Sequence, residues 1–158
     1  MLVVLTMVLE SNSAAQCEFL PPSSNQVLKY TFKPALIDGK LVIHTRLDFA
    51  GGRKRTAELE LPSDWAGQSH LETGIRNLKS LSADAVLLDT PKPNVKIMRY
   101  STDSGGAVSY DLVEDSSGPL ENPKQFRPVL QPEFFEFNTQ NAFVHPKFSR
   151  SDIVTVFF

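Results

Sequence analysis

The sequence predicts an all-β fold, an antiparallel β-sandwich of about eight or nine strands with one short helix. Three observations support this prediction. Apolar and polar residues alternate with a period of two in several runs, turns rich in Gly, Pro, Asp or Ser separate those runs, and a single stretch has helical spacing. The chain has 158 residues, 41% hydrophobic and 22% charged, which is enough for one domain with its own core.

The charge and the cysteine content exclude several kinds of site. There are 16 Lys and Arg residues against 18 Asp and Glu residues, which gives a net charge of −2. We therefore expect no nucleic-acid partner, because phosphate binding depends on surplus positive charge. Cys17 is the only cysteine, so the chain cannot form an internal disulfide or a site built on two thiolates.

Residues 1–27 are predicted to be a signal segment followed by a linker. Met1–Leu9 is nearly all apolar, Ser13-Ala14-Ala15 supplies the small residues that signal peptidase accepts, and Pro21-Pro22 marks the linker. We therefore expect export to the periplasm or out of the cell, although the basic residues that usually precede such a core are absent. The apolar stretch is too short to span a bilayer, so no membrane span is expected. The alternative interpretation is that Leu2–Leu9 is a first strand packed in the core.

The folded part is expected to comprise residues 28–158. In Lys40–Phe49, apolar residues at every second position alternate with mostly polar ones, which is the pattern of a strand with one buried face. Ala57–Leu61 repeats the pattern with glutamates on its other face. Gly51-Gly52 and Arg53-Lys54-Arg55 lie between the two runs, which predicts a hairpin with a flexible, charged loop.

A second hairpin is predicted further along the chain. Val95–Arg99 leads to the turn sequence Asp103-Ser104-Gly105-Gly106, and Val108–Leu112 leads away from it. Ser109 and Asp111 are expected to face outward from the second strand.

One short helix is predicted over Ser69–Leu78. Leu71, Ile75 and Leu78 fall at the i, i+4 and i+7 positions, and the first four residues have the form of a capping box. Gly74 limits the predicted helix to a few turns.

Shorter apolar runs complete the predicted set of strands. They are Ala85–Leu88, Phe134–Phe137, Phe143–Val144 and Ile153–Phe158. The last run is strongly β-prone and has no polar residue after it, so we interpret it as a strand that leads into a further domain.

The turn Asp103-Ser104-Gly105-Gly106 contains four of the five residues of the nucleophile loop of trypsin-like proteases. A catalytic triad would need His44 as the base and an acid to orient it. Thr102 stands where that loop has its first glycine, and the chain is too short for the two barrels of such an enzyme. We therefore interpret the motif as a hairpin turn, and a hydrolase using Ser104 remains a third hypothesis.

The sequence contains no recognisable metal or acid–base motif. The three histidines, His44, His70 and His145, lie far apart and lack the spacing of zinc ligands. Glu58 and Glu60 alternate on one strand, which is typical of a solvated face. We therefore expect no metal ligand and no cofactor in this chain.

Aromatic residues are the remaining candidates for recognition. Alternation places Phe135 and Phe137 on one face of a strand, which favours packing in the core. Four other aromatic residues are better candidates for an interface with a partner. These are Trp65, Phe134, Phe157 and Phe158.

Four short motifs, taken in order, resemble a known family. They are Leu61-Pro62-Ser63-Asp64-Trp65-Ala66-Gly67, Gly74-Ile75-Arg76-Asn77-Leu78, Val108-Ser109-Tyr110-Asp111-Leu112 and Asn141-Ala142-Phe143-Val144-His145-Pro146. Their order resembles that in the N-terminal domain of peptidase family sixty-one, the glycyl aminopeptidase type of zinc metallopeptidases. The resemblance covers about residues 28–158.

The resemblance implies a non-catalytic β-sandwich domain. In that family such a domain precedes a helical, thermolysin-like catalytic domain, whose H-E-x-x-H helix carries the zinc ligands and the catalytic Glu. No residue of this chain matches them, so we assign no catalytic or metal residue here, and zinc is implied only for the catalytic domain. The expected partner is that catalytic domain of the same protein, and the domain would meet peptide substrate only indirectly, by shaping access to the cleft.

An alternative from another class is a free-standing secreted β-sandwich that binds a polysaccharide or a protein. Trp65 and Tyr100 would be its stacking residues, and a row of exposed aromatic side chains would be its mark.

Overall fold

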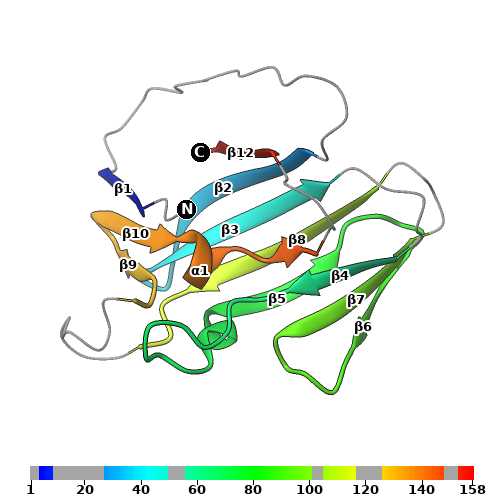
Figure 1. The fold of residues 1–158 in the computed structure, drawn as a ribbon. Helices are drawn as coiled ribbons and strands as arrows, with labels where there is room; N and C mark the ends of the chain where they lie inside the picture. Colours follow the sequence, from blue (N-terminus) through cyan, green and yellow to red (C-terminus); the bar gives the residue numbers. More distant parts are fainter. Residues whose placement is uncertain (1–3, 9–26, 50–55, 101–104, 117–125, 148–152) are drawn as a thin grey trace.

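The computed structural model describes residues 4–8, 27–49, 56–100, 105–116, 126–147 and 153–158. Within these residues the strands form three sheets, of five, four and three strands (Figure 1). All the strand pairs are antiparallel except one. The predicted all-β class is confirmed, with more and shorter strands than the eight or nine expected.

The five-stranded sheet is the largest layer. Its order is β12 (Ile153–Phe157), β2 (Val27–Ile37), β3 (Lys40–Phe49), β8 (Gly106–Val113) and β5 (Ile75–Ser80). β12 pairs with β2 in parallel and is the exception to the antiparallel rule. The predicted strand at the end of the chain is therefore present, and it extends this sheet at the β2 side.

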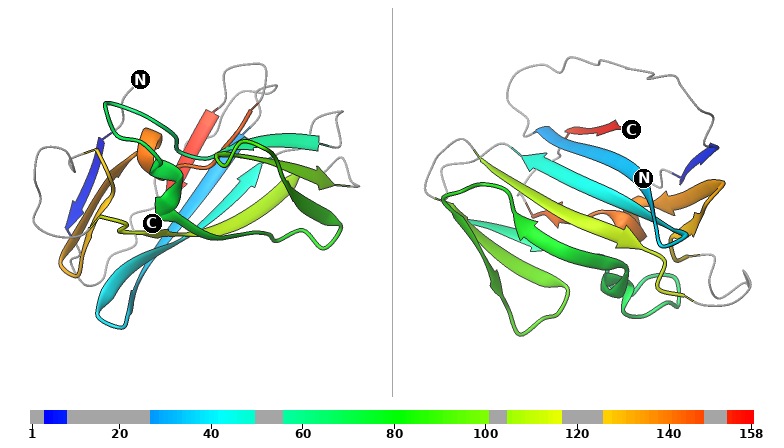
Figure 2. Two further views of the ribbon diagram at one scale, coloured as in Figure 1. Left: turned by 90° about the horizontal axis from the view of Figure 1, so that it is seen from below. Right: turned by 180° about the vertical axis from the view of Figure 1, so that it is seen from behind.

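Two smaller sheets lie against the inner face of the large one (Figure 2). One has the order β11 (His145–Pro146), β4 (Thr56–Glu60), β7 (Val95–Tyr100) and β6 (Ala85–Asp89). The other has the order β1 (Val4–Val8), β10 (Phe134–Asn138) and β9 (Val129–Gln131). Val4–Val8 is thus a strand paired with β10, in line with the alternative interpretation of the N-terminal stretch, and export stays a prediction.

Neither predicted hairpin forms. β3 and β4 lie in different sheets, and so do β7 and β8. The physical reason is that two amphipathic strands can bury their apolar faces either side by side or across a core, and period-two alternation is the same in both cases. Here the connections cross from one layer of the sandwich to the other, so β3 and β4 face each other through their apolar residues.

A hairpin that was not predicted joins β2 and β3, and its turn is Asp38-Gly39. Both residues have left-handed backbone, with φ angles of 51° and 75°. Asp-Gly is a strong signal for a two-residue hairpin turn of this kind. This hairpin was not predicted, although the Asp-Gly signal is present in the sequence.

The predicted helix over Ser69–Leu78 is wrong. A 3₁₀ turn, η1 (Leu71–Gly74), is followed directly by β5. His70 is in the left-handed region and its side chain does not cap the turn, so the expected capping box is absent. Pairing of β5 with β8 overrides the helical spacing, and a bulge between Arg76 and Lys79 accounts for the irregular apolar pattern.

The α-helix that does form is α1 (Thr139–Ala142). Asn138 caps it, and the side chain of Asn141 reaches back to the backbone N–H of Asn138, so the two residues make a reciprocal capping box. Among the described residues, no helix has the length and apolar character needed to cross a membrane.

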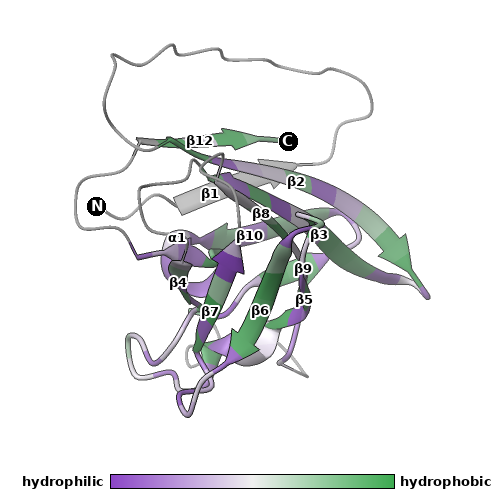
Figure 3. Ribbon diagram, turned by 90° about the vertical axis from the view of Figure 1, so that its right-hand side faces the viewer, coloured by the Kyte–Doolittle hydropathy of each residue, from purple (hydrophilic) through white to green (hydrophobic). Residues whose placement is uncertain are grey.

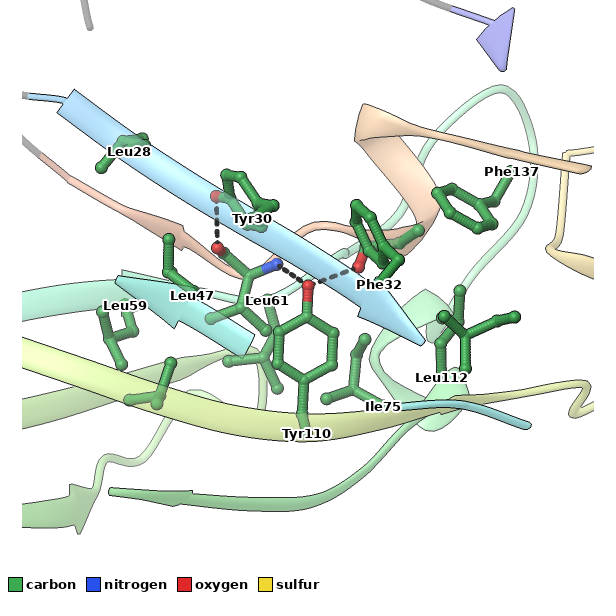
Figure 4. Packing of buried hydrophobic residues seen from close by; sticks show 14 of the residues in the cluster. Leu28, Tyr30, Phe32, Leu47, Leu59, Leu61, Ile75, Tyr110, Leu112 and Phe137 are labelled. Atoms are coloured by element: carbon green, nitrogen blue, oxygen red, sulfur yellow. Dashed lines mark hydrogen bonds between the residues drawn. The ribbon is translucent and has the colours of Figure 1, made fainter. Parts of the chain in front are cut away.

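The core lies between the layers and includes three buried tyrosines, of which Tyr30 and Tyr110 are drawn in Figure 4. The Tyr30 hydroxyl donates to the carbonyl of Val144 at 2.7 Å, and the Tyr110 hydroxyl donates to the carbonyl of Ala142 at 3.0 Å. Tyr110 also accepts a bond from the N–H of Val144. Burial raises the pKa of Tyr110, so it stays a neutral donor. These bonds tie the segment after α1 to the large sheet.

Candidate functional site

The four predicted interface aromatics do not form one patch. Trp65 lies in the loop after β4, where its backbone bridges to Gln68 and its half-buried ring packs edge-on against Phe126, with ring centres 5.2 Å apart. Figure 1 shows this loop far from the C-terminus, where Phe158 lies. Phe134 is half-buried on the face of β10 opposite to Phe135 and Phe137, whose predicted place in the core is confirmed.

The last two residues face opposite sides of the large sheet. The ring of Phe157 is on the outer face, with the Lys29 Nζ 4.6 Å from its centre. Phe158 stacks on Phe32, at 5.7 Å between ring centres, while remaining 46% exposed. Phe157 is therefore the one candidate that lies on a broad outer surface, and Phe158 partly covers the edge of the core.

The aromatic row expected for a sugar-binding surface does not form. Tyr100 is only 4% exposed and belongs to the core, where its ring packs edge-on against Phe49. It is therefore not available as a surface stacking residue beside Trp65.

A largely buried ion pair fixes the loops around Trp65. Arg127 Nη1 lies 2.6 Å from Asp115 Oδ2, with the two side chains 17% and 6% exposed. Arg127 also donates to the carbonyl of Ser69, and Thr73 donates to the same carboxylate oxygen of Asp115. The pair thus connects the chain after β8, the approach to η1 and the approach to β9. Nothing in the sequence pattern singled out these two residues.

On the outer face of the five-stranded sheet, several polar side chains form hydrogen bonds and ion pairs with one another. His44 Nδ1 lies 2.7 Å from Asp111 Oδ1, and Asn77 Nδ2 donates to Asp111 Oδ2, also at 2.7 Å. On the next row, Arg46 makes a two-pronged contact with Asp48, with Nε 2.8 Å from one oxygen and Nη2 2.6 Å from the other. Ser109 and Asp111 face outward, as predicted.

Two opposing influences act on the Asp111 carboxyl. Partial burial acts to raise its pKa, but the hydrogen bonds from Asn77 and His44, with the charges of His44 and Lys79, outweigh burial. The pKa of Asp111 therefore lies below its ordinary value, and the group is an anion at neutral pH.

His44 lies well along β3 from Gly106, which is at the described end of the Asp-Ser-Gly-Gly turn. Gly106 pairs with Phe49, which is five residues along β3 from His44, or about 16 Å at the usual rise per residue. Gly106 has a packing role, since a Cβ there would lie 2.6 Å from the Phe49 ring and 2.9 Å from Met98 Cε. Ser104 and Asp103 lie outside the described residues.

The other titratable candidates sit at the surface. His70 contacts Glu72 at 3.2 Å, and Lys147 Nζ lies 3.4 Å and 2.9 Å from carboxylate oxygens of Glu58 and Glu60, which confirms the solvated face predicted for these glutamates. Within the described ranges, no three His, Cys, Asp or Glu side chains are grouped so that they could hold a metal ion.

The sandwich is open between β5 and β6. A cleft of about 410 Å³ lies there, with Leu61, Ile75, Leu78 and Leu87 among its apolar lining and Lys96 among its charged lining. β6 is the outer strand of its sheet and is apolar along much of its length (Figure 3). Lys96 is paired with Asp89 at 2.7 Å, so a charged pair lies beside the apolar surface.

Comparison with known proteins does not assign the chain. No protein-family model and no curated protein matches it.

Proposed function

We propose that this chain is a non-catalytic β-sandwich domain of an aminopeptidase-like zinc metallopeptidase. In this proposal the domain packs on a catalytic domain and shapes the access of peptide substrates to its cleft. The proposal rests on the resemblance of the four motifs to peptidase family sixty-one, and on the way in which these motifs meet in the fold.

The observation that carries the proposal is that the second, third and fourth motifs contact one another, and that the first and fourth both contact Phe126. Tyr110 of the third motif donates to the carbonyl of Ala142 in the fourth. Ile75 of the second pairs with Leu112 of the third. These contacts join motifs that are far apart in the sequence into one packed unit.

The first motif is joined to the others through residue 126. Trp65 packs on the Phe126 ring, and Asn141 of the fourth motif donates from Nδ2 to the Phe126 carbonyl at 2.8 Å. The Leu61 side chain lies in the same core as Tyr110. The residues that carry the resemblance therefore lie in one continuous region, at the end of the sandwich where α1 lies.

In this proposal the zinc site belongs to the catalytic domain and not to this chain. The histidines described here lie on β3, before η1 and on β11, and they do not form a ligand set with the carboxylates around them. Within the part of the chain that the structure describes, the residues therefore do not fit a zinc site.

The purified chain tests the non-catalytic part of this proposal. Equilibrium dialysis against zinc should show no stoichiometric binding, and glycyl and alanyl peptide substrates should remain uncut. A single tight zinc site, or cleavage that survives further purification, would contradict the proposal.

Export is a separate part of the proposal. It predicts that the protein recovered from the periplasm or the medium begins after residue 15. N-terminal sequencing decides this, because an intact Met1 on the mature protein would contradict export by a cleaved signal segment.

A further inference from the structure

The outer face of the five-stranded sheet has a charge opposite to that of the whole chain. Its basic side chains are all exposed, and we call them the basic face: Lys29, Lys33, Lys40, Arg46, Arg76 and Lys79. The acidic side chains on the same face are Asp48 and Asp111. The chain as a whole has a net charge of −2, so this face differs in sign from the chain as a whole.

Both acidic residues are already engaged within the face. Arg46 holds Asp48 through two nitrogen atoms, while His44 and Asn77 hold the two oxygens of Asp111. Lys33, Arg76 and Lys79 form no salt bridge with any described residue. The cationic groups of this face are therefore exposed to solvent. Few anionic groups on the face are available to bind the cations of a partner.

Strand order brings these residues together in two rows. Lys33, His44, Asp111 and Arg76 are cross-strand neighbours on β2, β3, β8 and β5, and Thr31, Arg46, Ser109 and Lys79 form the next row. Lys33 and Arg76 are thus separated by three strand spacings, about 14 Å. The paired rows form a cationic surface on a regular sheet, so its shape is set before a partner binds.

The face also includes an aromatic group. Phe157 pairs with Thr31 in register and lies under the Lys29 ammonium group. Arginine and aromatic side chains are enriched where proteins meet. A sugar-binding surface would instead need a bare aromatic ring, and Lys29 covers this one.

We propose that the basic face binds an acidic segment or acidic surface of a partner protein. Charge complementarity carries this inference, since opposite potentials steer association and set the orientation of the complex. This inference assigns a surface to the proposed function. It rests on that function in one respect, namely that the domain binds a protein partner. The catalytic domain named there would be such a partner, joined through this face.

Poly-L-glutamate is a suitable probe of the face. Its binding to the purified chain, measured by isothermal titration calorimetry, should be detectable at low salt and weaken at high salt. Replacing two charges on the face, in Lys33→Gln/Arg76→Gln, should weaken binding about fivefold. The matched control, Lys92→Gln/Arg99→Gln, removes one exposed Lys and one exposed Arg away from this face and should bind like the parent.

Several outcomes would overturn the inference. These are an absence of binding to poly-L-glutamate, an equal loss in the control variant, or tighter binding of heparin with the same dependence on Lys33 and Arg76. Thermal unfolding of both variants checks that the fold is intact. The probe contains no peptidase domain, so failure here leaves the zinc and sequencing tests of the proposed function unaffected.

Discussion

At the residue scale, the account depends on a few polar side chains that connect distant parts of the chain. Tyr30 and Tyr110 hold the segment after α1, and Arg127 with Asp115 holds the loops around Trp65. The burial of Arg127 and Asp115 could not be read from the sequence, because an isolated Arg or Asp in a loop has no periodic pattern that indicates its environment. The alternating apolar residues, in contrast, were placed correctly because period two directly reports which face is buried.

The buried pair gives the first prediction. Arg127→Met should lower the free energy of unfolding by about 3–5 kcal/mol, because it leaves the Asp115 carboxylate buried without its cation. Chemical denaturation measures this loss. The double variant Asp115→Leu/Arg127→Met should recover much of the stability, since it removes the uncompensated charge as well. If the single and double variants were equally unstable, the ion pair would not be the cause.

Asp111 gives a prediction about pH. Its folded-state pKa is lowered, so its contribution to stability is present above its unfolded pKa, near 4, and is lost as the pH falls through the folded value. The stability of the parent should therefore decline more steeply than that of Asp111→Asn as the pH is lowered below about 4. Denaturation curves across this range decide it, and identical slopes would refute the role given to His44 and Asn77.

At the element scale, strands were easier to predict than their partners. The runs at Lys40–Phe49 and Ala57–Leu61 do contain strands, but neither strand was predicted to pair with the elements that it contacts. The helical spacing of Leu71, Ile75 and Leu78 was misleading, because a 3₁₀ turn followed by a bulged strand also buries residues at those intervals. The alternation within a strand indicates which of its two faces is buried. Which strands pair with one another depends on the arrangement of the whole sandwich.

The β2–β3 hairpin provides the prediction at this scale. Gly39 has a φ of 75° and no atom near the position of a Cβ, so the cost of a side chain there is conformational and not steric. Gly39→Ala should therefore destabilise the protein by about 1 kcal/mol. Gly39→Asn should cost less, because Asn tolerates the left-handed region better. Equal losses in thermal unfolding would argue against a conformational cause.

At the scale of the whole molecule, the basic face and the grouping of the four motifs are products of strand order. Lys33, Arg46 and Arg76 are far apart in the chain and become neighbours only because β2, β3, β8 and β5 are adjacent in the sheet. Composition alone gave a slightly acidic protein and could not show this concentration of charge. The contacts among the motifs likewise emerge only from the fold.

The central claim is that this sandwich serves a metallopeptidase catalytic domain. The most direct measurement is the nucleotide sequence immediately downstream of the codon for Phe158, read in all frames. The account predicts a continuing or frameshifted segment that encodes a helix with the H-E-x-x-H zinc motif. A clean stop followed by unrelated sequence would contradict it and would favour an independent binding module.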